Sequence, residues 1–123
     1  MTSMIRFLTL LALVVSSPSI TALAQTSTVI PDSDAPQHIG QNATVQGVVV
    51  AVFKSKKGNT FINFGDVYPN QTFTGWIPAG TPLASDPSIR SLQGKSVKIT
   101  GLIELYRGKA EIRILSKSQI TEE

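Results

Sequence analysis

The stretch from residue 43 to residue 65, ATVQGVVVAVFKSKKGNTFINFG, decides the fold because it holds two β-prone runs around a short polar turn. The first run, 43–54, is long and rich in β-branched residues, and Gly47 is a suitable place for a bulge or bend. The turn lies around Gly58 and Asn59, and 60–65 is the returning strand. A long first strand that bends can pair with neighbours in two sheets at once, as a small barrel requires.

Three further strands follow this hairpin. Residues 72–78 (TFTGWIP) alternate between inward and outward types and end at a proline, after a turn with its corner at 69–70. Residues 96–106 and 110–118 are β-prone, and a tight turn at 107–109 joins them. The sequence therefore predicts five strands in all.

A short helix is predicted between the third and fourth strands. Ser85 or Asp86 is the expected N-cap, Pro87 occupies the first helical position and Gly94 ends the helix. Five strands with a helix between the third and fourth are typical of an all-β, Greek-key OB-fold barrel. The alternative is an SH3-like barrel, in which the helical turn falls later in the chain.

The N-terminal segment predicts export. Residues 1–24 have the layout of a secretory signal peptide, with an apolar run at 7–15 and small residues at 22–24. The apolar run is too short to span a bilayer, which needs about 20 residues, so we expect no stable membrane anchor after cleavage. The exported chain is periplasmic or secreted. Residues 25–37 are polar, contain two prolines and predict a flexible leader, which makes 38–121 the OB-fold domain.

The residue types present restrict the chemistry. The chain has no cysteine and one histidine, and it shows neither a glycine-rich phosphate loop nor metal-ligand spacing. We therefore expect no cofactor, no metal site and no enzyme activity. Metal-dependent hydrolysis would need clustered carboxylates, for which Asp66, Glu104 and Glu111 are the internal candidates. The two glutamates could also face each other and form ordinary cross-strand ion pairs with Arg113 or Lys109.

Charge is unevenly distributed along the chain. Ten basic and four acidic residues lie between residues 37 and 121, which leaves a net charge of +6 there. The other acidic residues lie close to the two ends of the chain that follows the signal peptide. A basic domain of this kind attracts anionic partners.

Two segments carry a resemblance to a known family: FINFGDVYPNQTFTGWI at 61–77 and LQGKSVKITGLIELYRGKAEIRI at 92–114. They resemble the small OB-fold nucleic-acid-binding-like domains of exported bacterial proteins, which sometimes occur alongside secreted nucleases. The resemblance implies an OB barrel with a nucleic-acid-binding role. Ala110 departs from the pattern, which has proline after the Gly-Lys pair, so we expect a less rigid loop there.

OB-fold proteins bind oligomers across strands two and three, between the loops that join strands one to two and four to five. If Ile62 points into the barrel, Phe61 and Asn63 face outward, and the third strand then presents Trp76 on the same side. Outward rings stack bases for about 1 to 3 kcal/mol each, and basic loops neutralise phosphates. The candidate nucleic-acid-binding residues are Lys54, Lys56, Lys57, Phe61, Asn63, Tyr68, Trp76, Tyr106, Arg107 and Lys109.

Each of these features also has a simpler interpretation. The three lysines could be a solvated hairpin tip, a one-residue slip would bury Phe61 and Trp76, and Tyr106 could close the barrel end. Our prediction is a monomeric, non-catalytic module that binds single-stranded nucleic acid or another anionic oligomer with little sequence specificity. The alternative is a periplasmic protein-interaction or envelope-stress module whose groove holds a peptide, glycan or small ligand.

Overall fold

A computed structural model describes residues 28–123. The predicted signal peptide at 1–24 lies outside the described residues, as does the start of the predicted leader. No helix within 28–123 has the length and apolar character to cross a membrane. The elements, in chain order, are β1 (Val29–Pro31), η1 (Asp32–His38), β2 (Asn42–Lys54), β3 (Thr60–Phe64), β4 (Phe73–Ile77), η2 (Pro82–Ser85), η3 (Arg90–Leu92), β5 (Ser96–Tyr106), β6 (Lys109–Arg113), η4 (Lys117–Gln119) and β7 (Ile120–Glu122).

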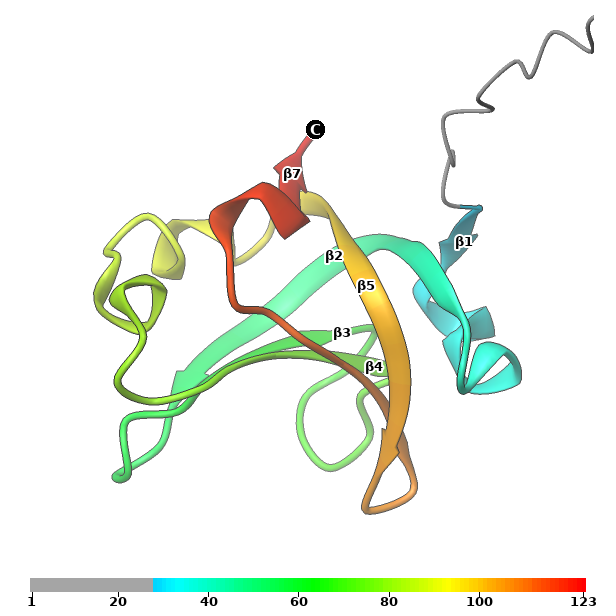
Figure 1. The fold of residues 1–123 in the computed structure, drawn as a ribbon, viewed down its shortest axis with the longest axis horizontal. Helices are drawn as coiled ribbons and strands as arrows, with labels where there is room; N and C mark the ends of the chain where they lie inside the picture. Colours follow the sequence, from blue (N-terminus) through cyan, green and yellow to red (C-terminus); the bar gives the residue numbers. More distant parts are fainter. Residues whose placement is uncertain (1–27) are drawn as a thin grey trace, which may run out of the picture.

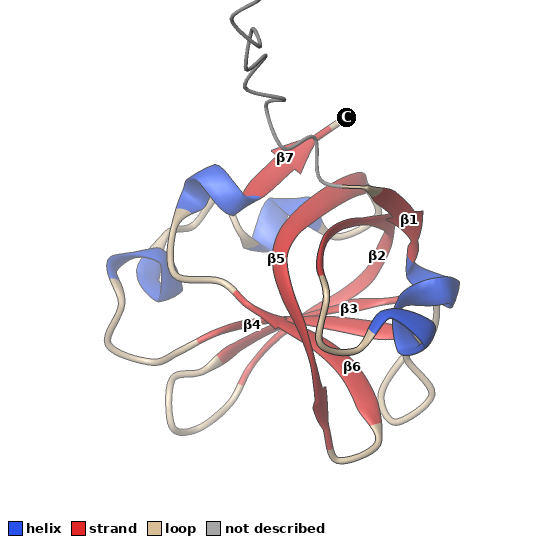
Figure 2. Ribbon diagram, turned by 45° about the vertical axis from the view of Figure 1, so that its right-hand side comes forward, coloured by secondary structure: helices blue, strands red, loops and turns tan. Residues whose placement is uncertain are grey.

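Strands β2 to β6 form a closed ring, and β1 and β7 extend it (Figures 1 and 2). The strand order is β1-β2-β3-β4-β6-β5-β7, and a further pairing between β2 and β5 closes the ring. Within the ring β4 and β6 are parallel, and the other neighbours are antiparallel. This topology, with helical residues between β4 and β5, is that of the OB fold, so the predicted fold is confirmed.

Strand β2 bends because it has two successive neighbours. It pairs with β5 from Asn42 to Val48, and from Val49 onward it pairs with β3. The register shifts between Val49 and Ala51, so the bulge lies just after Gly47, the position at which the bend was predicted. Glycine is needed at position 47 for close packing and not for the bulge. A Cβ at this position would lie 2.5 Å from the Asp32 carboxylate and clash with it.

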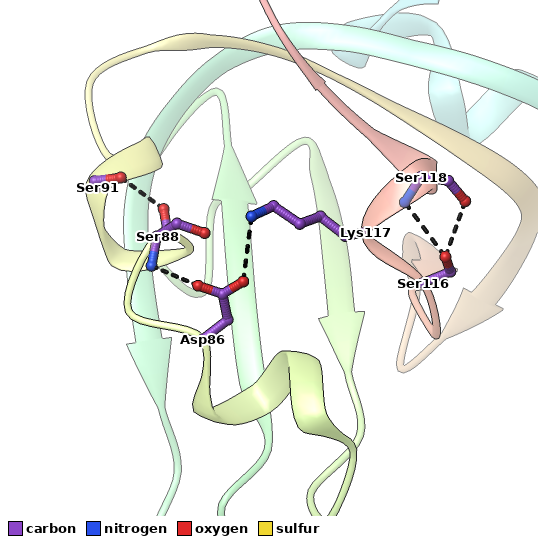
Figure 3. A network of polar contacts seen from close by, with 6 residues as sticks. All are labelled: Asp86, Ser88, Ser91, Ser116, Lys117 and Ser118. Carbon is purple, nitrogen blue, oxygen red and sulfur yellow. Dashed lines mark hydrogen bonds and ion pairs between the residues drawn. The ribbon is translucent and has the colours of Figure 1, made fainter.

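The helical segment between β4 and β5 consists of two short 3₁₀ helices, η2 and η3, where one helix was predicted. Asp86, a predicted N-cap, instead follows η2 with an extended backbone (φ −76°, ψ 116°), because proline disfavours the helical conformation in the residue before it. The Asp86 carboxylate accepts a hydrogen bond from the Ser88 amide at 2.9 Å (Figure 3). Gly94, with φ +84°, follows η3 and is the predicted stop.

Regular structure begins earlier than predicted, within the segment assigned to the flexible leader. β1 pairs in parallel with β2, and Ile30 is buried. Ala35 of η1 is fully buried, and Thr72 Oγ1 donates a hydrogen bond to Asp32 Oδ2 at 2.5 Å. These contacts tie β1 and η1 to the barrel.

The last predicted strand is shorter than expected. β6 ends at Arg113, and the chain then turns into η4, whose N-terminus is a capping box made by Ser116 and Gln119. The Gln119 side chain also accepts hydrogen bonds from the amides of Leu115 and Ser116, at 2.9 and 3.1 Å. This turn returns the chain to β5, along which β7 pairs.

The core fills the barrel from alternate strand positions. Its largest fully buried side chains are Phe64, Phe73, Ile62, Ile77, Ile99, Ile103, Ile112, Ile114, Val45, Val49 and Val97. At the middle of β4, Gly75 leaves space for its neighbours, since a Cβ there would lie 2.7 Å from Ile99 Cδ1 and 2.8 Å from Ile114 Cδ1. The core therefore fixes which side of β3 and β4 faces outward.

Candidate nucleic-acid interface

The strand register places the predicted face on the outside of the barrel. Ile62 and Phe64 of β3 are fully buried, and Phe61, which alternates with them, is half-buried on the opposite face. Asn63 has the same orientation as Phe61 but is only 5% exposed, so the prediction of an accessible Asn63 is wrong. Phe61 is paired with Trp76 of β4, so both rings are on the outer side. The predicted register is confirmed, and the alternative in which a slip buries these rings is wrong.

Four residues form a row across this outer face, one each from β2, β3, β4 and β6: Phe53, Phe61, Trp76 and Arg113. Each is the direct cross-strand partner of the next, and we call them the aromatic row. The Phe53 and Phe61 rings are stacked, with centroids 6.4 Å apart and planes at 20°. The Arg113 guanidinium carbon lies 4.9 Å from the centroid of the Trp76 ring, a cation–π contact.

Phe53 and Arg113 belong to this row but were not among the binding residues predicted from the sequence. Phe53 is 58% exposed and directly opposite Phe61. Arg113 lies between Ile112 and Ile114, which are both fully buried. The alternation in β6 therefore indicates an outward Arg113, a residue that was predicted only as an ion-pair partner for the glutamates.

A second row lies one step closer to the β5–β6 hairpin and contains Asn63, Thr74, Glu111 and Glu104, which we call the polar row. Thr74 Oγ1 donates a hydrogen bond to Asn63 Oδ1 at 3.0 Å. Glu111 and Glu104 face each other directly, as one reading of the sequence expected. Neither forms an ion pair within residues 28–123, so the expected pairing with Arg113 or Lys109 is not present there.

Glu111 has an unusual protonation equilibrium. Burial raises the pKa of its carboxyl group to about 7, and the negative charge of Glu104 adds to the rise. The positive charge of Arg113 acts in the opposite direction. Near neutral pH the centre of the face therefore changes its charge.

The β2–β3 turn supplies one basic edge of the face. Lys56 and Lys57 are exposed at its tip. Lys54, predicted to join them, lies elsewhere: it is paired with the inward-facing Thr60, and its Nζ donates a hydrogen bond to the Ala84 carbonyl of η2 at 3.3 Å. Successive strand residues point to opposite sides, so Lys54 faces away from Phe53 and the aromatic row.

The β5–β6 hairpin supplies the other edge. Tyr106 pairs with Lys109, and Arg107 and Gly108 form the turn with positive φ angles of 49° and 78°. The Arg107 guanidinium carbon lies 5.3 Å from the centroid of the Tyr106 ring, which is 51% exposed. Tyr106 is thus at the surface and does not close the barrel. Tyr68, 72% exposed, lies on the neighbouring β3–β4 loop.

The two basic hairpins flank the face from opposite ends of its strands. Thr60, next to the β2–β3 turn, is paired with Ile77 at the end of β4, whereas Ala110, next to the β5–β6 turn, is paired with Phe73 at the start of β4. In the view of Figure 1 both hairpins lie below the barrel, with the β2–β3 turn at the lower left and the β5–β6 hairpin at the lower right. The two rows lie between them.

The three ion-paired lysines all lie away from this face, where Lys54 and Arg90 form no ion pair within residues 28–123. Away from it, Lys95 pairs with Glu122 at 2.8 Å and Lys98 with Glu123 at 3.3 Å. A third pair, Lys117 with Asp86 at 3.4 Å, lies beside η3 (Figure 3). The basic residues of the face form no ion pair within residues 28–123; they are Lys56, Lys57, Arg107, Lys109 and Arg113.

The three internal carboxylates do not form a cluster. Asp66 Oδ1 accepts a hydrogen bond from the Val67 amide at 2.7 Å, which is turn chemistry. In the part of the chain that the structure describes, no three histidine, cysteine or acidic side chains are arranged to hold a metal ion. The glutamate pair lies in the polar row of the outer face.

Comparison with known proteins gives a fold match without a family. No protein family and no curated protein matches the sequence. The aspartyl-tRNA synthetase of Entamoeba histolytica is 14% identical with a TM-score of 0.52, over 86% of this chain and 23% of the enzyme. The asparaginyl-tRNA synthetase of Pyrococcus horikoshii is 14% identical with a TM-score of 0.51, over 76% and 22%. This chain thus spans under a quarter of either synthetase.

A smaller protein matches over most of its own length. The OBody AM1L10, solved bound to hen egg-white lysozyme, is 20% identical with a TM-score of 0.51, over 72% of this chain and 84% of the OBody. At these identities the shared property is the fold. The chain is an OB-fold domain.

Proposed function

We propose that this domain is a non-catalytic module that binds single-stranded nucleic acid, or another anionic oligomer, with little sequence specificity. The strand crosses β3 and β4 on the outer face, and its bases stack on the aromatic row. Lys56 and Lys57 hold phosphates at one end, and Arg107 and Lys109 hold them at the other.

One observation carries this proposal: five cations without ion-pair partners in residues 28–123 lie on or beside a face with partly exposed aromatic rings, and none of the three ion-paired lysines lies there. Ion pairing with a protein carboxylate and binding of a phosphate compete for the same ammonium group. The fold adds support, because the synthetases that share it are named for a nucleic acid, tRNA.

The test is a fluorescence titration. Trp76 is the single tryptophan of the chain and lies on the proposed face, so its emission reports on ligands there. We expect a single-stranded oligonucleotide to change this emission, with an affinity that falls steeply as salt rises. If an acidic glycan binds as tightly as the oligonucleotide, the ligand is an anionic oligomer in general and not nucleic acid in particular. If only a neutral glycan binds, the proposal is wrong.

A second candidate is binding of a peptide, a protein or a neutral glycan, as in an interaction or envelope-stress module. The OBody bound to lysozyme favours it, since it is an OB-fold chain in complex with a protein. Apolar residues dominate such contacts, and the exposed Phe53 and Tyr68 could supply them. Its affinity would respond little to salt, which separates it from the first proposal.

We also propose that the domain acts after export as a monomer. Support for export comes from the composition of residues 1–24 alone. Mass spectrometry of the protein recovered from a secreting host should show cleavage after Ala24, and size-exclusion chromatography should give the mass of one domain. An intact N-terminus on the recovered protein would contradict export.

A further inference from the structure

Glu111 is a largely buried residue whose carboxylate accepts no hydrogen bond from another side chain or amide within residues 28–123. It is only 7% exposed. It forms no ion pair there, and its pKa is set by burial and neighbouring charges, with no hydrogen bond contributing. The Glu111 oxygens are not fully enclosed, since Gln71 Oε1 is the one enclosed side-chain polar atom without a hydrogen-bond partner among the described residues. Partial burial nevertheless disfavours the charged carboxylate, and a ligand that donates hydrogen bonds to its accessible oxygens would offset that cost.

The position of Glu111 relative to the aromatic row determines which edge of a stacked base lies nearest to its carboxylate. It lies two residues before Arg113 on β6, and it is paired with Thr74, which lies two residues before Trp76 on β4. Two residues along a strand correspond to about 7 Å. A base that stacks on the aromatic row therefore directs an edge toward the polar row and toward Glu111.

Carboxylate geometry selects among the bases. Its two oxygens accept two parallel hydrogen bonds from a group with two adjacent donors. Guanine has such an edge, with the N1 hydrogen beside the N2 amino group. Cytosine and adenine each place an amino donor beside a ring-nitrogen acceptor, and thymine has one donor between two carbonyl oxygens. Single-stranded bases present these edges to proteins.

We infer that Glu111 gives the interface a preference for guanine at one position of the bound strand. The inference rests on the proposed nucleic-acid-binding function and adds one specific position to an otherwise sequence-tolerant face. Glu104 lies across from Glu111 but is exposed, so water already solvates its carboxylate. Glu111 is the member of the pair that gains from a ligand donor.

The protonation of Glu111 gives the inference a second readout. The charged form accepts both hydrogen bonds, and its raised pKa places the change of charge near pH 7. Glu104 on β5 and Lys109 and Arg113 on β6 are the charged groups around it, while β3 and β4 contribute the uncharged Asn63, Thr74 and Trp76. The guanine preference should therefore be present at pH 8 and be lost toward pH 6.

The experiment measures fluorescence anisotropy of a short labelled oligothymidylate whose central base is thymine, guanine, hypoxanthine, adenine or cytosine. At pH 8 and low salt, we expect the guanine strand to bind at least about fivefold more tightly than the thymine strand. Hypoxanthine lacks the N2 amino group and should lose most of this gain. This comparison uses the unaltered protein, so it does not depend on how any variant folds.

Two matched variants assign the preference to one carboxylate. Glu111→Gln should bind all five strands with nearly equal affinity, and somewhat more tightly overall because a negative charge is removed from the face. Glu104→Gln should keep the preference and shift its loss to lower pH, because it removes the negative charge that raises the pKa of Glu111. Thermal unfolding confirms that each variant is folded.

The outcomes separate the two levels of the proposal. Equal affinity for all five strands, tightest binding of cytosine or adenine, or a guanine preference that survives Glu111→Gln would overturn the inference and leave general nucleic-acid binding intact. Failure of every strand to bind at low salt would overturn both.

Discussion

At the scale of single residues, Glu111 links pH to stability. The pKa of Glu111 is about 7 in the folded protein and near 4.5 without the fold, so the folded state holds its proton more tightly. Stability from this group is fully present below pH 4.5 and is lost as the pH rises toward 7. We expect Glu111→Gln to stabilise the protein at pH 8 by roughly 1 to 3 kcal/mol and to have little effect at pH 5.

Urea unfolding at the two pH values measures this difference. Glu104→Gln is the matched control, since Glu104 is exposed and contributes only through its charge, so its gain at pH 8 should be smaller. Equal stability of Glu111→Gln and the unaltered protein at pH 8 would contradict the raised pKa.

Trp76 is the residue whose role in binding and in folding can be separated most directly. Its ring lies on the outer face and contacts Arg113, while the core beneath is filled by other side chains. Trp76→Ala should therefore weaken oligonucleotide binding by about 1 to 3 kcal/mol while the domain stays folded. Trp76→Phe keeps a ring and should retain most of the affinity. Circular dichroism that shows an unfolded Trp76→Ala variant would contradict this placement.

At the scale of elements, the tightest packing lies under the middle of β4. Adding a methyl group at Gly75 brings it against Ile99 and Ile114, so Gly75→Ala should destabilise the domain by about 1 to 3 kcal/mol. Ile114→Val removes the Cδ1 atom in the way, and alone it should cost roughly 0.5 to 1.5 kcal/mol. In the double variant the two effects should be less than additive, as a double-mutant cycle of urea unfolding would show. Strict additivity would mean that the added methyl group is accommodated elsewhere.

The elements that the sequence predicted are those with a repeating pattern. The alternation in 60–65 and 72–78 set the register of β3 and β4, and with it the outward placement of Phe61 and Trp76. β1 has three residues, too few to show a period, and it is held by pairing with residues of β2 that lie 15 positions later in the chain. One helix was predicted here, but the structure has two short ones. Asp86 precedes a proline and therefore adopts an extended backbone, which ends η2 despite the helix-start signals at Ser85 and Pro87.

The site was predictable where it followed from strand alternation and less so where it depended on contacts between elements. In the sequence Lys54 belongs to a lysine cluster with Lys56 and Lys57. In the structure its side chain points away from them, because Lys54 pairs with Thr60 and its Nζ donates to the Ala84 carbonyl. The environment of Glu111 depends on three strands meeting, since β4 and β5 flank it on β6. Burial of that carboxylate is a property of the assembled barrel and not of any segment.

At the scale of the whole molecule, charge is divided between two regions of the barrel. Lys95 and Lys98 lie beside β7 and are neutralised by Glu122 and Glu123. Lys56 and Lys57 form no ion pair within residues 28–123, so they contribute more to the field that an approaching anion meets. Net charge alone does not distinguish these lysines, and only the fold assigns their partners.

This division predicts different effects from equal changes of charge. Replacing both Lys56 and Lys57 with Gln should weaken binding of every single-stranded sequence alike. It should also reduce the slope of log affinity against log salt by about 1.4, which is about 0.7 for each lost phosphate contact. Replacing both Lys95 and Lys98 with Gln removes the same charge, but it should leave the slope nearly unchanged, because these lysines contact carboxylates of the protein. Equal slopes for the two double variants would mean that anions respond to total charge, and the outer face of β3 and β4 would then have no special role.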